Sequence, residues 1–417
     1  MSTRLRPLKG PVEASVTIPG SKSYTNRALI MAAMTNGTVT LEKPLESDDT
    51  VAMMNCLTRL GIPNLRKGDV FEITGGLGQV ANGQCDLDCN ISGTTIRFLT
   101  ALAAVAPGTQ TLYGKEGLNR RPIGELVDGL RGLGADITYG EREGFPPIKI
   151  SSGRLNSGVT SMNGDVSSQY FSAMLMAAPA VGDVTIEVVG EQISKPYIDM
   201  TIDTMREFGV NVTNDSYKKY SVAANQKYTR THYAVESDAS SASYFAAIAA
   251  LTKSRITLAN VNPASKQPDM DFLMILKKMG AEVIPEKNGL TVVGRGVTPL
   301  TVDMEGCPDQ AQTLAVLAAF AKGTTTITGV RSLRVKETER VVAVENELRK
   351  MGIETLSTHD TLTIHGGNPK PTRIDTYGDH RMAMSFAVGG TLLDGMEIAP
   401  GPTLTSRDVR FCAAVGC

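Results

Sequence analysis

One arrangement of polar and apolar positions recurs six times along the chain. A short polar turn runs directly into a helix of small apolar residues, as it does between residues 19 and 34. Six such helices begin 69 to 75 residues apart, at Lys22, Gly93, Ser168, Ser240, Asp309 and His380. Self-similarity at a fixed period indicates a repeated structural unit. The pattern therefore predicts six copies of one unit.

A second marker recurs with the same period. Five charged amphipathic segments end in a bulky apolar residue followed by glycine, at Leu60-Gly61, Leu133-Gly134, Phe208-Gly209, Met279-Gly280 and Met351-Gly352. Glycine is the usual residue where a helix ends in a left-handed conformation. These five positions are therefore predicted helix ends.

Each unit is expected to read strand, helix, strand, helix, strand, strand. In the first unit, residues 26–34 fit a helix, residues 38–42 fit a strand, and Ser47 fits the cap of a second helix that runs to Leu60. The second helices of later units are expected to open at Pro122 (as the first helical residue), at Ser194-Lys195-Pro196, and between Lys336 and Arg340.

Two helices on one face of a small sheet cannot bury both of their surfaces alone. Six units are therefore expected to pack their helices inward and leave their sheets outside, as two lobes of three repeats. This predicts an α/β (α+β) fold, a two-lobed inside-out α/β barrel of six βαβαββ repeats. The boundary between repeats three and four is expected within residues 230–238.

The composition is that of a globular protein without a polyanionic partner. The 417 residues carry a formal net charge of −1, so no overall field attracts nucleic acid or an anionic membrane. No apolar run approaches the roughly 18 residues that a membrane span needs, and residues 1–10 lack the apolar core of a secretory signal. The six cysteines form no C-x-x-C pair. Free thiols in a reducing cytoplasm, and no metal site, are therefore expected.

Cationic residues gather at the expected helix starts, where helix N-termini favour anions. They are Lys22, Arg27, Arg97, Arg121, Lys336, Arg340 and Arg381. Interleaved with them are Ser23, Ser167, Ser168, Gln169 and Ser194, and the acids Asp309 and Glu337. Seven cations and two acids predict ligands with several negative charges, of the phosphate and carboxylate type.

Three of the candidate residues also have a purely structural interpretation. Asp309 fits a helix cap, a role that is compatible with chemistry. Glu337 has the spacing of an ion pair with Arg340, and a histidine such as His380 is often structural. Spacing alone leaves both interpretations open for each residue. The chain has no nucleotide P-loop, G-x-G-x-x-G or H-E-x-x-H motif.

Five stretches make the chain resemble a known family. They are PGSKSYTNRAL, ISGTTIRFL, NRRPIGELVDGLRGLGA, DVSSQYFSAMLMAAP with SKPYIDMT, and RVKETER with YGDHRMAM. They resemble the 5-enolpyruvylshikimate-3-phosphate synthases of the enolpyruvyl transferase family. The resemblance implies two lobes of three βαβαββ units: lobe one at residues 1–18 and 236–417 (repeats four to six with the N-terminal strand), and lobe two at residues 19–235. It also implies an active site in the cleft between them.

The resemblance implies transfer of the enolpyruvyl group of phosphoenolpyruvate to the 5-hydroxyl of shikimate 3-phosphate, without metal or organic cofactor. The implied contacts to shikimate 3-phosphate are Ser23, Arg27, Ser167, Ser168, Gln169, Ser194 and Tyr197. Those to phosphoenolpyruvate are Lys22, Arg121, Arg340 and Arg381, with Gln169 nearby. Further expected substrate-binding residues are Gly93, Thr94, Asp309, Ser332 and Lys336.

The implied reaction adds a proton to the methylene carbon, joins the hydroxyl to C2 and expels phosphate. It needs a proton donor, a base and cations for the leaving phosphate. Glu337 is expected as the acid, Asp309 as the base, Lys22 as a proton carrier, and His380 as an aid to the phosphate. Glyphosate, which occupies the phosphoenolpyruvate site in this family, is expected to make contact through Gly93. A cytoplasmic monomer is also expected.

The sequence departs from the family pattern in three places. Ile91 stands where the family usually has Asn, Phe98 follows Arg97 where Pro is common, and Thr405 stands where a C-terminal Lys is expected, with Arg407 two residues on. Two alternatives follow. A homologue that binds ligand without catalysis is suggested by Thr405. An enolpyruvyl transferase for UDP-N-acetylglucosamine is disfavoured by Lys22-Ser23, and by the absence of Cys in the loop before Arg121.

Overall fold

The structure is a computed structural model and describes residues 2–80, 82–151 and 155–400. The contacts divide it into two compact units. Lobe two comprises residues 20–236, and lobe one comprises residues 2–19 and 237–400. The chain passes from lobe one to lobe two after Pro19 and returns after Glu236. Thr405 and Arg407 lie outside the described residues.

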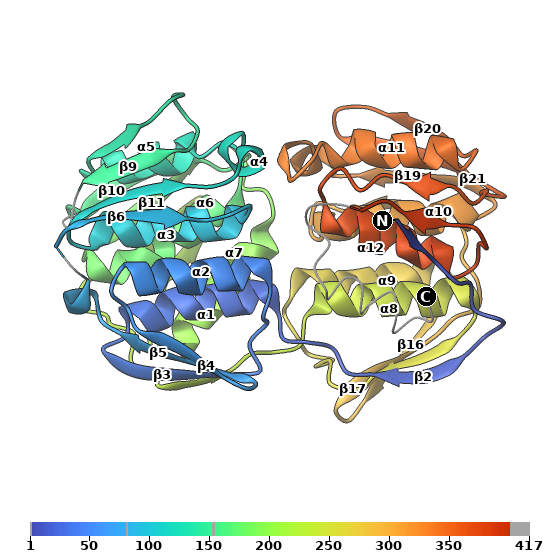
Figure 1. The fold of residues 1–417 in the computed structure, drawn as a ribbon, viewed down its shortest axis with the longest axis horizontal. Coiled ribbons are helices and arrows are strands. Elements are labelled where there is room, and N and C mark those ends of the chain that lie inside the picture. The colour runs from blue at the N-terminus through green and yellow to red at the C-terminus, as the bar shows by residue number, and fades with distance from the viewer. Residues whose placement is uncertain (1, 81, 152–154, 401–417) are drawn as a thin grey trace. The chain divides into compact units, whose positions relative to one another are not determined.

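Lobe two contains repeats one to three (Figure 1). Repeat one has α1 (Lys22–Met34), β3 (Gly37–Glu42), α2 (Asp48–Arg59), β4 (Asn64–Lys67) and β5 (Val70–Gly75), followed by η1 (Leu77–Gln79). Repeat two has β6 (Gln84–Asp88), α3 (Gly93–Val105), β7 (Thr109–Tyr113), α4 (Glu116–Asn119), α5 (Gly124–Gly132), β8 (Ile137–Tyr139) and β9 (Ile148–Ser151). Repeat three has β10 (Gly158–Asn163), α6 (Ser168–Ala177), η2 (Ala178–Ala180), β11 (Val184–Val189), α7 (Lys195–Glu207), β12 (Thr213–Asp215) and β13 (Lys219–Val222), and β14 (His232–Ala234) follows.

Lobe one contains two N-terminal strands and repeats four to six. The strands are β1 (Thr3–Arg4) and β2 (Glu13–Val16). Repeat four has α8 (Ala239–Thr252), β15 (Arg255–Leu258), η3 (Pro268–Met270), α9 (Asp271–Lys278), β16 (Glu282–Glu286) and β17 (Gly289–Val293). Repeat five has β18 (Thr301–Asp303), η4 (Pro308–Gln310), α10 (Ala311–Phe320), β19 (Gly323–Thr328), η5 (Arg331–Val335), α11 (Arg340–Lys350), β20 (Glu354–Ser357) and β21 (Thr361–Gly366). Repeat six has β22 (Arg373–Ile374), α12 (His380–Gly390) and β23 (Glu397–Ile398).

The expected α/β class is confirmed, and the expected order of strands and helices is complete in repeats two, three and five, while the described part of repeat six has only β22, α12 and β23. Repeats two, three and five each form an open four-stranded sheet in which the first two strands are parallel and the other two pairs are antiparallel, as in β6-β7-β9-β8. None of the six sheets closes on itself within the described part of the chain. In repeat six the parallel pair β22–β23 gains β1 as its antiparallel neighbour.

Repeats one and four receive their first strand from a distant part of the sequence. Strand β2 pairs in parallel with β15 of repeat four, with Ala14 opposite Ile256. Strand β14, at the end of lobe two, pairs in parallel with β3 of repeat one, with Tyr233 opposite Leu41. The two chain crossings thus each leave a strand behind to complete a sheet of the lobe from which the chain departs.

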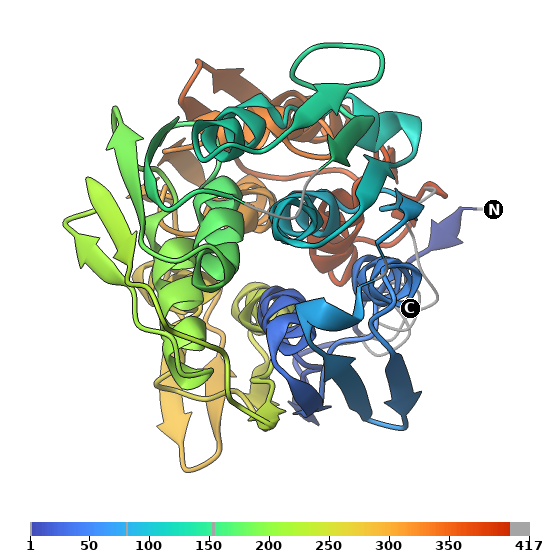
Figure 2. The ribbon, with the colours of Figure 1, turned by 90° about the vertical axis from the view of Figure 1, so that its left-hand side faces the viewer.

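Each lobe has its own hydrophobic core around three largely buried helices. These are α1, α3 and α6 in lobe two, and α8, α10 and α12 in lobe one. Figure 2, which faces lobe two, shows its helices toward the middle and its strands at the periphery. Alanine-rich sequences suit the inner helices because small side chains let neighbouring helices approach closely. No helix of the described residues is both long and apolar enough to cross a membrane.

The predicted helix ends are confirmed. The glycines after α2, α5, α7, α9 and α11 all have positive φ, with values of 87° at Gly61, 93° at Gly134, 96° at Gly209, 112° at Gly280 and 77° at Gly352. Such a φ is strained for residues with a Cβ. The sequence marker therefore reports a real backbone requirement.

The helix starts expected at Lys22 and between Lys336 and Arg340 are confirmed, and the one expected at Pro122 was wrong. Helix α1 begins at Lys22, and Ser21 caps it by accepting a hydrogen bond from the Tyr24 N–H. Helix α11 begins at Arg340, capped by Glu339, so Lys336 and Glu337 precede it. Pro122 is not in α5, which begins at Gly124.

Candidate active site

The six residues that mark the repeats all lie where an inner helix begins. Lys22, Gly93, Ser168 and His380 are the first residues of their helices, Ser240 is the second residue of α8, and Asp309 lies in η4 immediately before α10. Backbone N–H groups at these starts have no partner within the helix, and the helix dipole favours negative charge there. The fold thus repeats one anion-attracting feature in both lobes.

In lobe two, Lys22 is paired with a carboxylate. Its Nζ lies 2.9 Å from Oδ2 of Asp49, the second residue of α2. The Asp49 carbonyl accepts a hydrogen bond of 3.0 Å from Thr95 Oγ1 on α3. Asp49 therefore links three helices of this lobe at the position of the expected proton carrier. Sequence reasoning assigned Asp49 no role at this site.

Arg27 is nearly fully buried and organises three helices of lobe two. Its Nε donates to Thr201 Oγ1 at 2.7 Å, and its Nη2 donates to the Tyr197 carbonyl at 3.1 Å, both on α7. It also donates to the Ser23 carbonyl on α1 and to Ser172 Oγ on α6. Burial lowers its pKa to about 10, which leaves the guanidinium charged at neutral pH. Arg27 thus fixes the helix starts that carry Ser23 and Tyr197.

Gln169 joins the starts of α3 and α6. Its Oε1 accepts a hydrogen bond of 2.8 Å from Arg97 Nη1, and its Nε2 donates to Thr94 Oγ1 at 3.3 Å. Ser167 caps α6 by accepting the Gln169 N–H. These contacts bring together four expected residues, Thr94, Ser167, Ser168 and Gln169. The guanidinium of Arg97 also lies over the ring of Tyr170, at 5.2 Å from the ring centroid.

Gly93 and Arg121 are in close contact. A Cβ atom added to Gly93 would lie 2.6 Å from the central carbon of the Arg121 guanidinium. Arg121 is only 9% exposed and follows the short helix α4. The absence of a side chain at residue 93 therefore gives Arg121 its place against the N-terminus of α3. Ser194, the N-cap of α7, has a left-handed φ of 52° and forms no side-chain cap.

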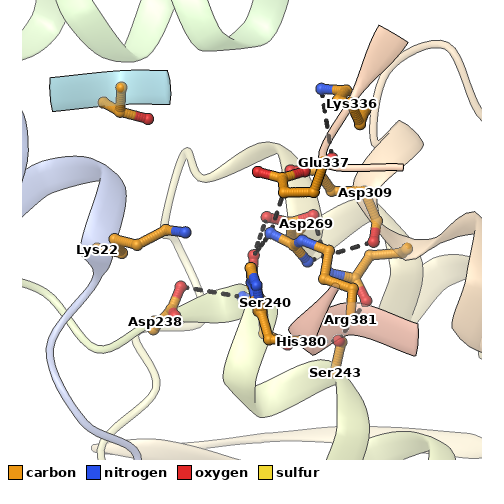
Figure 3. Close-up of polar contacts among 12 residues, drawn as sticks. Lys22, Asp238, Ser240, Ser243, Asp269, Asp309, Lys336, Glu337, His380 and Arg381 are labelled. Carbon is orange, nitrogen blue, oxygen red and sulfur yellow. Dashed lines mark hydrogen bonds and ion pairs between the residues drawn. The ribbon is translucent and has the colours of Figure 1, made fainter. Parts of the chain in front are cut away.

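In lobe one, Asp309 accepts contacts from three cations. Its Oδ1 lies 2.9 Å from Arg340 Nη1 and 3.5 Å from Lys336 Nζ, and its Oδ2 lies 3.1 Å from Arg381 Nη2. Figure 3 shows Asp309 between Lys336 and Arg381. Burial by itself would raise the pKa of the Asp309 carboxyl, but the three cations outweigh burial and hold that pKa well below its usual range. Asp309 is therefore an anion at any working pH.

Arg340 is 2% exposed and meets three carboxylates. In addition to Asp309, its Nε lies 2.6 Å from Asp379 Oδ2 and its Nη2 lies 2.7 Å from Glu337 Oε2. Burial disfavours its charge, yet the carboxylates of Asp379, Glu337 and Asp309 more than compensate and raise its pKa. The ion pair between Glu337 and Arg340 expected from their spacing is confirmed, although Glu337 lies before the helix.

Asp379 holds the start of α12. Its side chain caps this helix by accepting the Arg381 N–H at 2.8 Å, while the same carboxylate binds Arg340. His380, the first residue of α12, is one-third exposed, and its Nδ1 lies 4.0 Å from Asp379 Oδ1. The sequence pointed to the neighbours of Asp379 but assigned it no role. Its link to Arg340 joins positions 39 residues apart and has no local sequence signal.

The remaining expected residue of lobe one, Ser332, lies in η5, four residues before Lys336. Sequence reasoning missed Asp269, which accepts a hydrogen bond of 2.6 Å from Ser240 Oγ. Its only sequence signal is an aspartate next to a proline, which is common in turns. Among the described residues, no group of three or more His, Cys, Asp and Glu side chains could hold a metal ion. The cysteines at positions 56, 85, 89 and 307 are free.

Comparisons with known proteins agree with this arrangement. The family model described as EPSP synthase (3-phosphoshikimate 1-carboxyvinyltransferase) matches residues 8–407. A protein of Sulfurovum sp. (strain NBC37-1) named 3-phosphoshikimate 1-carboxyvinyltransferase is 42% identical over 397 residues, which cover 93% of this chain and 92% of that protein. A protein of Vibrio atlanticus (strain LGP32) with the same name is 42% identical over 398 residues, covering the same shares of both chains.

Solved structures of EPSP synthase from Acinetobacter baumannii are also similar. One has a TM-score of 0.78 at 25% identity, covering 95% of this chain and 93% of that chain. Another has a TM-score of 0.80 at 23% identity, covering 100% of this chain and 98% of that chain, and it supports the fold alone.

Proposed function

This chain belongs to the EPSP synthase family, and from this we propose that it is a 3-phosphoshikimate 1-carboxyvinyltransferase. It transfers the enolpyruvyl group of phosphoenolpyruvate to the 5-hydroxyl of shikimate 3-phosphate and releases phosphate. The observation that carries the proposal is the family match over residues 8–407. The cations at the helix starts support it, because both substrates are anions that such starts attract.

Each lobe supplies a distinct part of the binding machinery in this proposal. In lobe two, Ser23, Arg27, Ser167, Ser168, Gln169, Ser194 and Tyr197 contact shikimate 3-phosphate, and Thr94 lies beside them. Phosphoenolpyruvate is contacted by Lys22, Gly93 and Arg121 of the same lobe and by Arg340 and Arg381 of lobe one. Asp309, Ser332 and Lys336 of lobe one are further substrate-binding residues. Both lobes act on the same pair of substrates, so substitutions in either lobe abolish one common activity.

The lobe-one carboxylates divide the proton transfers between them. Glu337 gives a proton to the methylene carbon of phosphoenolpyruvate, and the 5-hydroxyl then adds to C2 as Asp309 takes its proton. In the elimination, the Glu337 carboxylate takes a proton back from the methyl group of the adduct, and the double bond forms again as phosphate leaves. Lys22 carries protons, and His380 and the cations stabilise the phosphate that leaves. Asp309 is a weak base while Arg340, Lys336 and Arg381 contact it. A bound anion that competes for these cations raises the pKa of Asp309 and makes it a better base.

An assay of the full chain tests the proposal. The protein is mixed with shikimate 3-phosphate and phosphoenolpyruvate, phosphate is measured, and the organic product is identified by mass. We expect phosphate and the enolpyruvyl ether in equal amounts, and neither when one substrate is omitted. Binding of both substrates without phosphate release would instead indicate a silent homologue, which Thr405 suggests. Turnover only with UDP-N-acetylglucosamine would indicate the sister reaction.

Three further parts of the proposal are tested separately. Every step described uses proton transfer and charge stabilisation by side chains, so we expect activity to survive a chelator and extensive dialysis. A monomer is expected in light scattering at the concentrations of the assay. A cytoplasmic location is expected in fractionated cells.

A further inference from the structure

A buried carboxylate outside the proposed substrate contacts lies next to the start of α8. The segment around η3 is fixed there by Gln267, whose Oε1 accepts the Ala239 N–H at 3.1 Å and whose Nε2 donates to the Ser237 carbonyl at 2.7 Å. This attachment places Asp269, which is 6% exposed, against Ser240. Hydrogen bonds between the Gln267 side chain and the backbone at the start of α8 thus hold the segment that carries Asp269.

Asp269 accepts one hydrogen bond at each oxygen. Oδ2 accepts from Ser240 Oγ at 2.6 Å, and Oδ1 accepts from Gln310 Nε2 at 3.0 Å. Because the Ser240 hydroxyl donates its proton to Asp269, its oxygen presents lone pairs to other donors. Arg381 Nη2 donates to that oxygen at 3.4 Å. Figure 3 shows Asp269, Ser240 and Arg381 pointing toward one another.

The Arg381 guanidinium is thus held by two carboxylates, one directly and one through a hydroxyl. Its Nη2 lies 3.1 Å from Asp309 Oδ2 and also donates to Ser240 Oγ. Arg381 Nη1 also donates to the Asp309 carbonyl at 3.2 Å, so Asp309 contacts both terminal nitrogens, and Ser240 adds a contact to Nη2 on a separate helix, α8. Burial raises the pKa of Asp269, and the charge of Arg381 opposes that rise. The carboxylate and the guanidinium therefore stabilise each other's charged forms.

We propose that Asp269 is a positioning residue: it orients the Ser240 hydroxyl and thereby holds the Arg381 guanidinium for phosphoenolpyruvate. The effect on substrate rests on the proposed function, whereas the effect on Arg381 does not. An Asn at this position has the same shape but only one accepting oxygen, so it cannot accept from both Ser240 and Gln310. When its amide N–H₂ faces Ser240, the hydroxyl must turn and donate elsewhere, and the Arg381 contact is lost.

Kinetics of Asp269→Asn and Ser240→Ala test the proposal. Both variants are expected to raise KM for phosphoenolpyruvate about tenfold, as for loss of a contact to a charged group, and to leave KM for shikimate 3-phosphate within about twofold of wild type. Ser240→Thr, which keeps the hydroxyl, should restore most of the lost affinity. Ser385→Ala is the matched control: Ser385 is buried on α12, as Arg381 is, and bonds Thr313 on α10.

A double-mutant cycle separates positioning from general structural support. In an Arg381→Met background, Asp269→Asn is expected to change kcat/KM for phosphoenolpyruvate by less than twofold, because its effect passes through Arg381. Full additivity of the two losses, or equal rises of both KM values, would overturn the inference.

A crystal structure of Asp269→Asn tests whether Asp269 positions Arg381 without relying on activity. If the wild-type protein forms no product, that result refutes only the proposed function. We expect Arg381 Nη2 to leave Ser240 Oγ in the variant. An unchanged guanidinium at that position would refute the positioning role.

Discussion

At the scale of single residues, lobe one holds a charge-balanced cluster. Arg340, Arg381 and Lys336 meet the carboxylates of Asp309, Glu337 and Asp379. Buried charges are tolerated when they are paired and hydrogen-bonded, and removing one partner costs far more than the pair contributes. An anionic ligand therefore has to compete for cations that are already engaged. The carboxylates of the cluster are therefore paired with these cations when no ligand is bound, and they share the cations with the ligand when it binds.

Substitution of Glu337 tests its proposed role as the acid. Glu337→Ala is expected to lower kcat by about 10² to 10⁴, the usual contribution of a positioned acid or base, and to change substrate dissociation constants by less than tenfold. Glu337→Gln keeps an oxygen for Arg340 but not the transferable proton, so its kcat should fall by a similar factor. Steady-state kinetics and titration calorimetry provide the comparison. A matching loss of binding and turnover would mean that Glu337 serves mainly as an ion-pair partner.

Gly93→Ala tests the contact with Arg121. The added methyl group would lie 2.6 Å from guanidinium atoms, so Arg121 must move, and KM for phosphoenolpyruvate is expected to rise about tenfold with kcat less affected. Inhibition by glyphosate should weaken in parallel. Gly117→Ala on α4 is the control, since a Cβ there meets nothing within 4 Å. Unchanged kinetics and inhibition in Gly93→Ala would rule out this contact.

At the scale of elements, the repeats are defined by how helices begin and end. Serine or aspartate side chains cap most inner helices, as Ser92 does for α3 and Asp238 does for α8. The second helices end at glycines of positive φ. Both devices act within a few residues, so each repeat specifies its own elements. The same devices place backbone N–H groups and functional side chains at the same end of each inner helix.

Alanine substitutions at two glycines isolate the backbone requirement. Gly352 has a φ of 77° and Gly367 has no left-handed φ, while a Cβ at either would meet nothing within 4 Å. Gly352→Ala is expected to destabilise lobe one by roughly 1–2 kcal/mol, the cost of a left-handed conformation with a Cβ. Gly367→Ala should be nearly neutral or slightly stabilising. The free energy of unfolding of both variants is measured by urea unfolding and by hydrogen exchange of the α11 amides. Equal effects would show that the conformation at residue 352 is not required.

At the scale of the whole molecule, each lobe has its own core and completes one of its sheets with a strand that is distant in the sequence. Strand β2 completes the sheet of repeat four and β14 completes that of repeat one. Lobe two is one continuous segment that contains all the strands of its sheets, whereas lobe one needs the N-terminal segment before lobe two to complete the sheet of repeat four. The ionic cluster adds a dependence on pH to the stability of lobe one, because its carboxylates must be charged.

Asp309 makes a specific prediction for this pH dependence. Its pKa is lower in the folded protein than in the unfolded chain, where it is about 3.9. Its stabilising contribution is thus fully present above about pH 5 and is lost as the pH falls below the unfolded value. The Tm of Asp309→Asn should lie well below that of wild type at pH 7, and the difference should shrink at pH 3. Asp394→Asn, at a carboxylate that is 77% exposed, should show little difference at either pH. A constant difference for Asp309→Asn would contradict the assignment.

The sequence by itself determined the six repeats, the positions of the glycine stops and most of the polar residues at the inner helix starts. These features depend on interactions within a few residues, which local patterns report. Local patterns placed the start of α5 at Pro122, whereas the helix begins at Gly124, because the residue that begins a helix depends on its exact backbone.

Only the tertiary structure decided which distant groups meet. Asp49 with Lys22, Asp379 with Arg340, and Asp269 with Ser240 and Arg381 are contacts between different elements. The pairing of β2 with β15 joins strands about 240 residues apart. Such contacts form because packed helices and paired strands bring chain segments together, and no short stretch of sequence contains both partners.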